Sequence, residues 1–343
     1  MPPPFRIGVM QLSMEPLGEM IEAAKVMDRA GMDTIWLAEA YPWWRKHGME
    51  ARSSTVTSAL IAQATERLTI GWGIISPFTR HPVQAAMDAR VVQEAAGPGR
   101  FLLGFGTSKI FLNNARLNSR RTLGPMREAV EIVRGVLAGG AFEYEGETFS
   151  ASVPALLAEA ETPRDVPPVY IAATAPKMQM LAGEIADGCL TPSITTPAFV
   201  GYTCGNVKAD IDIGCTVIAS IGEDRDAGRD GAREIAGMYL ANKFQNIKGA
   251  ADTLLELAEI EMEELRPVAE AMERGGRLAA KEQVSDDLLD RCKPIAGTPA
   301  DCIEAIEEYR DAGCSHVMLE LWGDRRHEQI ELFGREVLPR FRR

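Results

Sequence analysis

Leu68-Thr69-Ile70-Gly71-Trp72-Gly73-Ile74-Ile75 is an almost wholly apolar run in a chain of 343 residues. The turn-forming stretch Ser76-Pro77-Phe78-Thr79-Arg80-His81-Pro82 follows it, and residues 82–95 then have the spacing of a helix. A short apolar run bounded by turn residues predicts a buried strand, and the helix after it predicts a crossover to a parallel neighbour. The stretch therefore predicts one strand–helix unit of an α/β fold.

Apolar runs of the same kind recur along the chain and predict eight strands in all. The other seven are expected at residues 5–10, 34–38, 100–106, 168–173, 188–191, 213–221 and 316–321. Eight apolar strands alternating with helices favour a (β/α)₈ TIM barrel with insertions, formed as a single domain over residues 1–343. An open doubly wound sheet is the alternative, but no Gly-x-Gly-x-x-Gly follows the first strand.

An internal similarity supports this arrangement. Residues 30–37, Ala-Gly-Met-Asp-Thr-Ile-Trp-Leu, resemble residues 312–319, Ala-Gly-Cys-Ser-His-Val-Met-Leu, and each predicts a helix end, a glycine cap and a buried strand. Residues 142–149 predict a small hairpin. Residues 229–290 are helix-rich and acidic, and predict a helical excursion before the eighth strand with a solvated face and no catalytic role.

Composition narrows the classes of partner. The net charge of -12 disfavours nucleic acid and anionic membrane surfaces, and no apolar run reaches the roughly 18 residues of a membrane span. The N-terminus lacks the apolar stretch of a signal peptide, so a cytoplasmic protein is expected. Six cysteines without a Cys-x-x-Cys pair, together with four histidines, predict neither a disulfide framework nor a metal site.

In a barrel of this kind, functional residues follow the C-terminal ends of the strands. After the second strand, residues 39–44 (Glu-Ala-Tyr-Pro-Trp-Trp) suit a pocket for a flat ring; a surface acid with aromatics packing a loop is the alternative. After the third strand, Arg80 and His81 are either anion partners or structural residues. After the fourth strand, residues 104–109 (Gly-Phe-Gly-Thr-Ser-Lys) suit a polar group bound by backbone amides.

The segment after the fifth strand predicts an anion site. Residues 173–176, Ala-Thr-Ala-Pro, open a helix that runs to about residue 186, with Thr174 as its expected N-cap and Pro176 in its first turn. Small residues here would leave backbone amides available at the positive end of the helix, which suits a phosphate. Thr298-Pro299 carries the same signature at another helix, so simple capping is the alternative.

Together these segments resemble the luciferase-like superfamily of flavin- and deazaflavin-dependent oxidoreductases. Within it they are most similar to the branch that contains methylenetetrahydromethanopterin reductase and other enzymes of coenzyme F420. The resemblance covers nearly the whole chain, and the third-strand stretch is its most specific part. Its motifs are residues 36–39, 73–82, 100–106, 171–176 with 186–188, 297–299 and 336–341.

The resemblance implies a barrel with insertions, a homodimer, and coenzyme F420 or FMN at the barrel mouth with its ring above the third strand. It also implies a cis peptide bond at Gly73–Ile74 and a cofactor phosphate on Ala173, Thr174 and Ala175. Glu39 falls where the family keeps an acid near the ring. The full set of expected cofactor-binding residues is Gly73, Ile74, Ser76, Gly106, Thr107, Ala173, Thr174, Ala175 and Thr191.

Two departures from the family pattern bear on function. Several deazaflavin enzymes carry an acid shortly after the fourth strand, where this chain has Lys109, which joins Glu39 as a candidate catalytic residue. Met10 and Gln11 stand where some pterin reductases have an acid, so no pterin substrate is assigned. The leading hypothesis is hydride transfer between F420 or FMN and a small organic substrate. The alternatives are an FMN-dependent monooxygenase and a non-catalytic flavin-binding relative.

Overall fold

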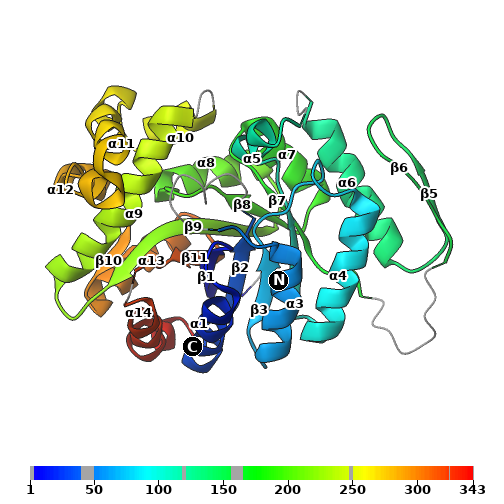
Figure 1. Ribbon diagram of the computed structural model, residues 1–343, viewed down its shortest axis with the longest axis horizontal. Helices are drawn as coiled ribbons and strands as arrows, with labels where there is room; N and C mark the ends of the chain where they lie inside the picture. The colour runs from blue at the N-terminus through cyan, green and yellow to red at the C-terminus, as the bar shows by residue number, and fades with distance from the viewer. Residues whose placement is uncertain are drawn as a thin grey trace.

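The protein is described by a computed structural model covering residues 4–39, 50–117, 121–155, 165–246, 250–323 and 325–342. Within these ranges the side chains of residues 109, 110, 114, 246 and 250–252 are not described. Eight parallel strands form a ring in the order β9-β11-β1-β2-β3-β4-β7-β8, and pairing of β8 with β9 closes it (Figure 1). The barrel prediction is confirmed, and the open-sheet alternative is wrong because no gap separates β8 from β9.

The barrel strands lie where the apolar runs predicted them, and four of the eight, β3, β4, β7 and β11, are shorter than those runs by a residue or more. Their bounds are β1 (Arg6–Leu12), β2 (Thr34–Ala38), β3 (Thr69–Trp72), β4 (Phe101–Phe105), β7 (Val169–Ala172), β8 (Gly188–Thr191), β9 (Asp212–Ile221) and β11 (His316–Glu320). The two repeated joints are also present. Gly31 and Gly313 have φ of 82° and 106°, a region that L-residues with a Cβ avoid.

Helices cover the outside of the barrel and bury their apolar faces against it. They are α1 (Leu17–Ala30), α3 (Ser54–Ala64), α4 (Pro82–Ala96), α5 (Lys109–Asn114), α6 (Leu123–Leu137), α7 (Pro176–Ile185), α8 (Pro197–Val207), α13 (Pro299–Asp311), α14 (Arg326–Leu332) and α15 (Leu338–Phe341). The predicted hairpin is present as β5 (Phe142–Glu145) and β6 (Ser150–Val153), although its second strand begins after residue 149.

The chain between β9 and β11 is mainly helical and lies beside the barrel (Figure 1). It contains α9 (Arg225–Asn246), α10 (Ala250–Leu257), a 3₁₀ turn (Met262–Leu265), α11 (Arg266–Lys281) and α12 (Asp286–Arg291). These helices share an apolar core of their own. A short strand that the sequence did not predict, β10 (Ile295–Gly297), pairs with the outer end of β9, because β9 continues beyond its pairing with β11.

Large apolar side chains fill the middle of the barrel. Trp36 is fully buried there, and a Cβ at Gly71 on the neighbouring strand would lie 2.4 Å from its ring. Gly71 is therefore required by the indole beside it. The other members of this central layer are Met10, Leu102, Tyr170, Leu190 and Met318.

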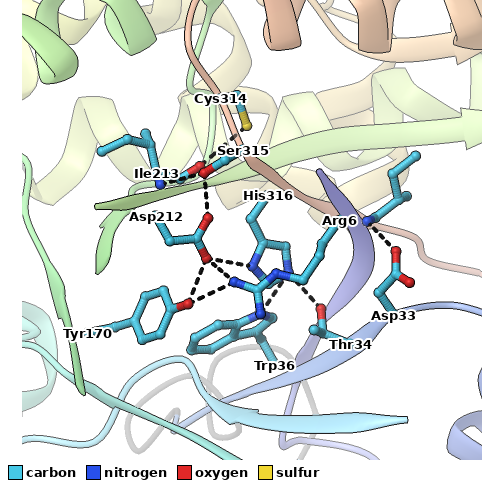
Figure 2. A network of polar contacts seen from close by, with 11 residues as sticks. Arg6, Asp33, Thr34, Trp36, Tyr170, Asp212, Ile213, Cys314, Ser315 and His316 are labelled. Carbon is cyan, nitrogen blue, oxygen red and sulfur yellow. Dashed lines mark hydrogen bonds and ion pairs between the residues drawn. The ribbon is translucent and has the colours of Figure 1, made fainter. Parts of the chain in front are cut away.

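A polar network that we call the lower cluster fills the N-terminal end of the barrel (Figure 2). Arg6 forms an ion pair with Asp212, and the Tyr170 hydroxyl donates to Asp212 Oδ2 at 2.6 Å. His316 Nδ1 lies 3.4 Å from the same oxygen. The lower cluster comprises Arg6, Thr34, Trp36, Tyr170, Asp212, Ser315 and His316.

Burial and hydrogen bonding fix the charge states of the lower cluster. Burial acts to raise the pKa of Asp212, but the hydrogen bond from His316 and the charge of Arg6 outweigh it, and the pKa lies far below its usual range. Burial lowers the pKa of His316 more than its bond to Asp212 raises it, so the ring is neutral at pH 7. Its Nε2 then accepts from Trp36 Nε1 at 3.3 Å, which leaves Nδ1 protonated toward Asp212.

Candidate active site

The C-terminal ends of the barrel strands form one rim, and the residues expected to act together lie along it. Glu39 follows β2, Gly73 and Ile74 follow β3, and Gly106 follows β4. Ala173–Ala175 follow β7, and Thr191 ends β8. Since β2, β3, β4, β7 and β8 are consecutive in the sheet, the expected residues lie on one side of the mouth.

The corner between β3 and β4 has the backbone that the family resemblance implied. The Gly73–Ile74 peptide bond is cis, so this prediction is confirmed. The chain then rejoins the sheet, because Ile75 N donates to Gly104 O and Gly106 N donates to Ile75 O, both at 3.0 Å. A Cβ at Gly106 would lie 2.6 Å from Ile74 Cγ1. Gly106 is therefore needed to admit the Ile74 side chain.

The turn after this corner is built by its own polar side chains. Ser76 is buried, and its Oγ accepts from Phe78 N at 3.4 Å. The His81 ring caps α4, since Nδ1 accepts from Val83 N at 3.3 Å. This contact gives His81 a structural role at the start of α4.

Glu39 is held by Arg80 at the edge of the mouth. Its side chain is 15% exposed, and its Oε1 lies 3.7 Å from Arg80 Nη1, while Arg80 Nε binds Asp88 at 2.9 Å. Burial raises the pKa of the Glu39 carboxyl, and the charge of Arg80 opposes this only in part. The sequence had assigned the opposing charge to Lys109, and Arg80 is the cation found beside Glu39.

An open cavity of about 290 Å³ lies in front of this pair. Glu39, Arg52, Arg80 and Phe111 are among its lining residues, so a carboxylate and two guanidinium groups face the same space. Lys109 begins α5 near this cavity, but its side chain lies outside the described residues, as do the expected ring-pocket residues 41–44. Thr107, two residues earlier, is half-buried at the end of β4.

The N-cap of α7 lies one residue later than expected. Ala175 is the N-cap, with φ -82° and ψ 142°, and no side chain caps the helix; the expectation that Thr174 does so is wrong. Pro176 lies in the first turn as expected. Ala173 N already donates to Leu190 O at 2.9 Å, which extends the sheet pairing beyond β7. Backbone donors for an anion therefore come from the residues after Ala173.

Thr191 and Thr298 each use their side-chain hydroxyl in a local hydrogen bond. Thr191 is buried, and its Oγ1 accepts from Thr195 Oγ1 at 2.7 Å. At α13, Thr298 and Asp301 form a reciprocal capping box, so the simple capping expected at Thr298 is confirmed.

The sequence did not predict Glu320, a buried acid on the opposite side of the mouth. Glu320 ends β11 and is fully buried, and the hydroxyl of Tyr239 on α9 donates to its Oε1. Burial raises the pKa of Glu320 to about 8, although hydrogen bonds from Tyr239 and Ser193 oppose the shift. The sequence feature that could have identified Glu320 is its position as a single acid at the end of an apolar strand, Val317-Met318-Leu319-Glu320.

Among the described residues, no three His, Cys, Asp or Glu side chains are grouped so as to hold a metal ion. Within the same ranges, no helix has both the length and the apolar character that a membrane crossing requires.

A closed parallel barrel with its candidate residues on the C-terminal rim defines a (β/α)₈-barrel enzyme. More particularly, the chain belongs to the luciferase-like monooxygenase family, whose model matches residues 3–316.

Relatives extend over almost the whole chain. The 5,10-methylenetetrahydromethanopterin reductase of Archaeoglobus fulgidus is 28% identical and covers 93% of this chain and 94% of its own length. The F420-dependent glucose-6-phosphate dehydrogenase of Nakamurella multipartita is 26% identical, with 99% and 98% covered. The structure of the coenzyme F420 dependent tetrahydromethanopterin reductase of Methanopyrus kandleri shares the fold with a TM-score of 0.86, at 24% identity and 99% and 100% coverage. The sequence-based assignment to the superfamily is confirmed.

Proposed function

We propose that this chain is an oxidoreductase that transfers a hydride between coenzyme F420 and a small organic substrate. The observation that carries the proposal is the arrangement of the rim. Ile74 lies across Gly106 at the β3–β4 corner, and the uncapped start of α7 follows β7 on the same rim. Since β4 lies between β3 and β7, the two places are two strand spacings apart, about 10 Å. That separation suits a ring and a phosphate joined by a five-carbon chain.

The residues present fit such a cofactor. The start of α7 offers backbone N–H groups without a side-chain cap, and the partial positive charge of the helix end favours a phosphate there. Gly73, Ile74 and Ser76 would support the ring from the β3 side, and Gly106 and Thr107 from the β4 side. Thr191 lies next along the rim at the end of β8.

When bound, F420 supplies two-electron hydride chemistry, and the chain supplies position and electrostatics. Glu39 presents a carboxyl at the mouth whose pKa is raised by burial, which suits a group that exchanges protons or orients substrate. Arg80 keeps that carboxyl in place through the contact at 3.7 Å. We assign Lys109 a supporting role as a proton donor or anion partner at the same mouth.

FMN is the second candidate cofactor, because it shares the ring and phosphate chemistry and the family takes its description from monooxygenases. The absorption and mass spectra of the copurified cofactor, followed by titration with F420 and FMN, test the proposal. Preferential binding of F420 supports it. Oxygen uptake with reduced FMN, without F420 binding, would replace it by a monooxygenase, and binding of either cofactor without any turnover would indicate a non-catalytic relative.

We also propose that the chain works as a homodimer of single-domain barrels, with the 229–290 region as a helical excursion outside the barrel. Support comes from exposed apolar side chains on the neighbouring helices α3 and α4. They are spaced one helical turn apart on each helix, at Val56 and Leu60 and at Met87 and Val91. Sedimentation equilibrium of the native protein and of Val91→Arg measures the oligomeric state. The cytoplasmic location stays a prediction.

A further inference from the structure

A polar network, which we call the α7–α8 network, lies directly behind the start of α7. It consists of Gln179 on α7 and of Thr203 and Asn206 on α8. The side chains of Gln179 and Thr203 are fully buried. The two helices pack closely one turn further along, where a Cβ at Gly183 would lie 2.0 Å from Val207 O. Gln179 is therefore enclosed between two closely packed helices.

The hydrogen bonds of this network fix the orientation of the Gln179 amide. Thr203 Oγ1 donates its proton to Phe199 O at 2.9 Å, so it accepts from Gln179 Nε2, which lies 3.0 Å away. On the other side, Asn206 Nδ2 donates to Gln179 Oε1 at 2.9 Å. The second proton of Gln179 Nε2 then points to Ala173 O at 3.4 Å. The reversed amide would place its oxygen against that carbonyl.

Ala173 is consequently held by both of its backbone polar groups. Its N–H donates to Leu190 O on β8 at 2.9 Å, and its carbonyl accepts from the Gln179 side chain. The backbone N–H of Gln179 also donates to Ala175 O at 3.1 Å. A single residue of α7 therefore binds the carbonyl on each side of Thr174.

These contacts determine where the Thr174 N–H points. Among the described residues the one cis peptide bond is Gly73–Ile74, so the Ala173–Thr174 bond is trans, and its C=O and N–H point in opposite directions. The C=O points to Gln179, at the α7–α8 interface. The Thr174 N–H therefore points away from that interface, and no group among the described residues accepts from it.

Packing alone does not explain a glutamine at this position. A buried amide loses its contacts with water, whereas an apolar side chain would fill the same space without that cost. The other buried residues of the α7 face nearby, Met178, Leu181 and Ala182, are apolar. A fully hydrogen-bonded buried network holds its members in one geometry. The distinct contribution of Gln179 is therefore the orientation of the backbone at the start of α7.

We propose that Gln179 is a positioning residue for the cofactor, and that through Ala173 O it holds the Thr174 N–H toward the cofactor phosphate. This inference rests on the proposed function, since it takes the start of α7 as the phosphate site. Gln179 lies on the buried side of the helix and acts without touching the cofactor. Its effect is on binding of the phosphate and not on binding of the ring.

The test compares F420 with its phosphate-free deazariboflavin fragment, which keeps the ring and the five-carbon chain. Fluorescence titration of the purified full-length protein measures both dissociation constants. Gln179→Met removes the amide at similar length, and the misdirected N–H should then lose a charge-assisted hydrogen bond. We expect F420 to bind at least about tenfold more weakly, which corresponds to about 1.4 kcal/mol, and the fragment affinity to change by less than about twofold. A purely structural role would weaken both ligands alike or neither.

Thr203 supplies a second pair of variants. Thr203→Val keeps the shape of the side chain but removes the acceptor that orients the Gln179 amide, and should weaken F420 binding about threefold or more without affecting the fragment. Thr203→Ser keeps the hydroxyl and should retain the native affinity. Gln283→Met replaces an exposed glutamine after α11 and is the matched control. If Gln179→Met fails to fold, unchanged F420 affinity in Thr203→Val refutes the assignment.

The titrations separate this inference from the proposed function. If the native protein binds F420 no more tightly than the fragment, the start of α7 does not hold the phosphate, and the phosphate site and the role of Gln179 are both refuted. If the native protein prefers F420 and Gln179→Met keeps that preference in full, the proposed function stands and only the role of Gln179 is refuted. Loss of the preference in a Gln179→Met protein that urea denaturation shows to be folded supports the role.

Discussion

The two ends of the barrel each bury a carboxyl group, and they treat it in opposite ways. At the N-terminal end, Asp212 is surrounded by Arg6, Tyr170, Ser315 and His316, and its pKa lies far below the usual range. At the C-terminal end, the Glu320 carboxyl has its pKa raised to about 8, and its Oε2 has no hydrogen-bond partner among the described residues. The first is an ionised group beside the charge of Arg6, although the buried Nε of Arg6 has no hydrogen-bond partner among the described residues, and the second is a neutral acid near pH 7.

The two ends of barrels of this type have different roles. Polar residues at the N-terminal end serve stability, whereas ligands bind at the C-terminal end. Among the described residues, unpaired buried polar atoms occur at both ends: Arg6 Nε in the lower cluster, and Gln11 Oε1 and Glu320 Oε2 near the C-terminal ends of their strands. We therefore expect substitutions in the lower cluster to change folding, and substitutions at the mouth to change binding.

The largest effect is expected at the lower cluster. Asp212→Asn leaves the half-buried Arg6 guanidinium without its counter-charge, and should lower the free energy of unfolding by about 3 kcal/mol at pH 7. Urea denaturation measures this, with exposed Asp210→Asn as the control two residues away. A loss below about 1 kcal/mol would show that the network does not stabilise the barrel.

Ionisation of Glu320 should lower the free energy of unfolding, whereas ionisation of a carboxyl in a stabilising ion pair raises it. The pKa of Glu320 is about 8 in the folded chain and near 4.5 unfolded, so the unfolded state loses this proton first and native stability falls as pH rises from 5 to 8. Glu320→Gln removes this loss. In urea denaturation, the free energy of unfolding of the variant should rise relative to that of the native protein by up to about 1.4 kcal/mol per pH unit. A difference independent of pH would mean that Glu320 titrates normally.

A smaller effect, confined to binding, is expected at the start of α7. Ala175→Asp puts a carboxylate beside the proposed phosphate site and should weaken F420 binding about tenfold or more, whereas the fold tolerates an acid at a helix start. Fluorescence titration with F420 measures the affinity. Ala300→Asp, in the first turn of α13, is the matched control, and equal affinities in all three proteins would place the phosphate elsewhere.

The smallest effect is expected from Glu39→Gln. Its contact with Arg80 is long and partly exposed, so the free energy of unfolding should change by less than about 1 kcal/mol. Because its pKa is raised by burial, ionisation above the ordinary glutamate range should weaken binding of the anionic cofactor about threefold as pH rises. F420 titrations across pH should lose this dependence in Glu39→Gln and keep it in the exposed control Glu50→Gln. Retention of the dependence in Glu39→Gln would assign it to another group.

Local sequence patterns were sufficient to predict the barrel strands and many of the residues on the rim. Apolar runs separated by helix signals placed the eight strands, and the Thr298-Pro299 signature gave a true cap. The same kind of signature failed at Thr174, because the strand pairing continues through Ala173 and the helix starts one residue later. Such a shift depends on where the neighbouring strand ends, which a single segment does not contain.

The sequence by itself determined the fold class, the family and the positions that reach the mouth, because these depend on residue periodicity and on short motifs between chain neighbours. Only the tertiary structure decided which side chains meet. Arg80 reaches Glu39, Tyr239 reaches Glu320, and Arg326 reaches Glu15 from 311 positions away. These pairs form when strands and helices pack together, as when β11 comes beside β1, and they set the charge of each group through burial and partners that no linear pattern records.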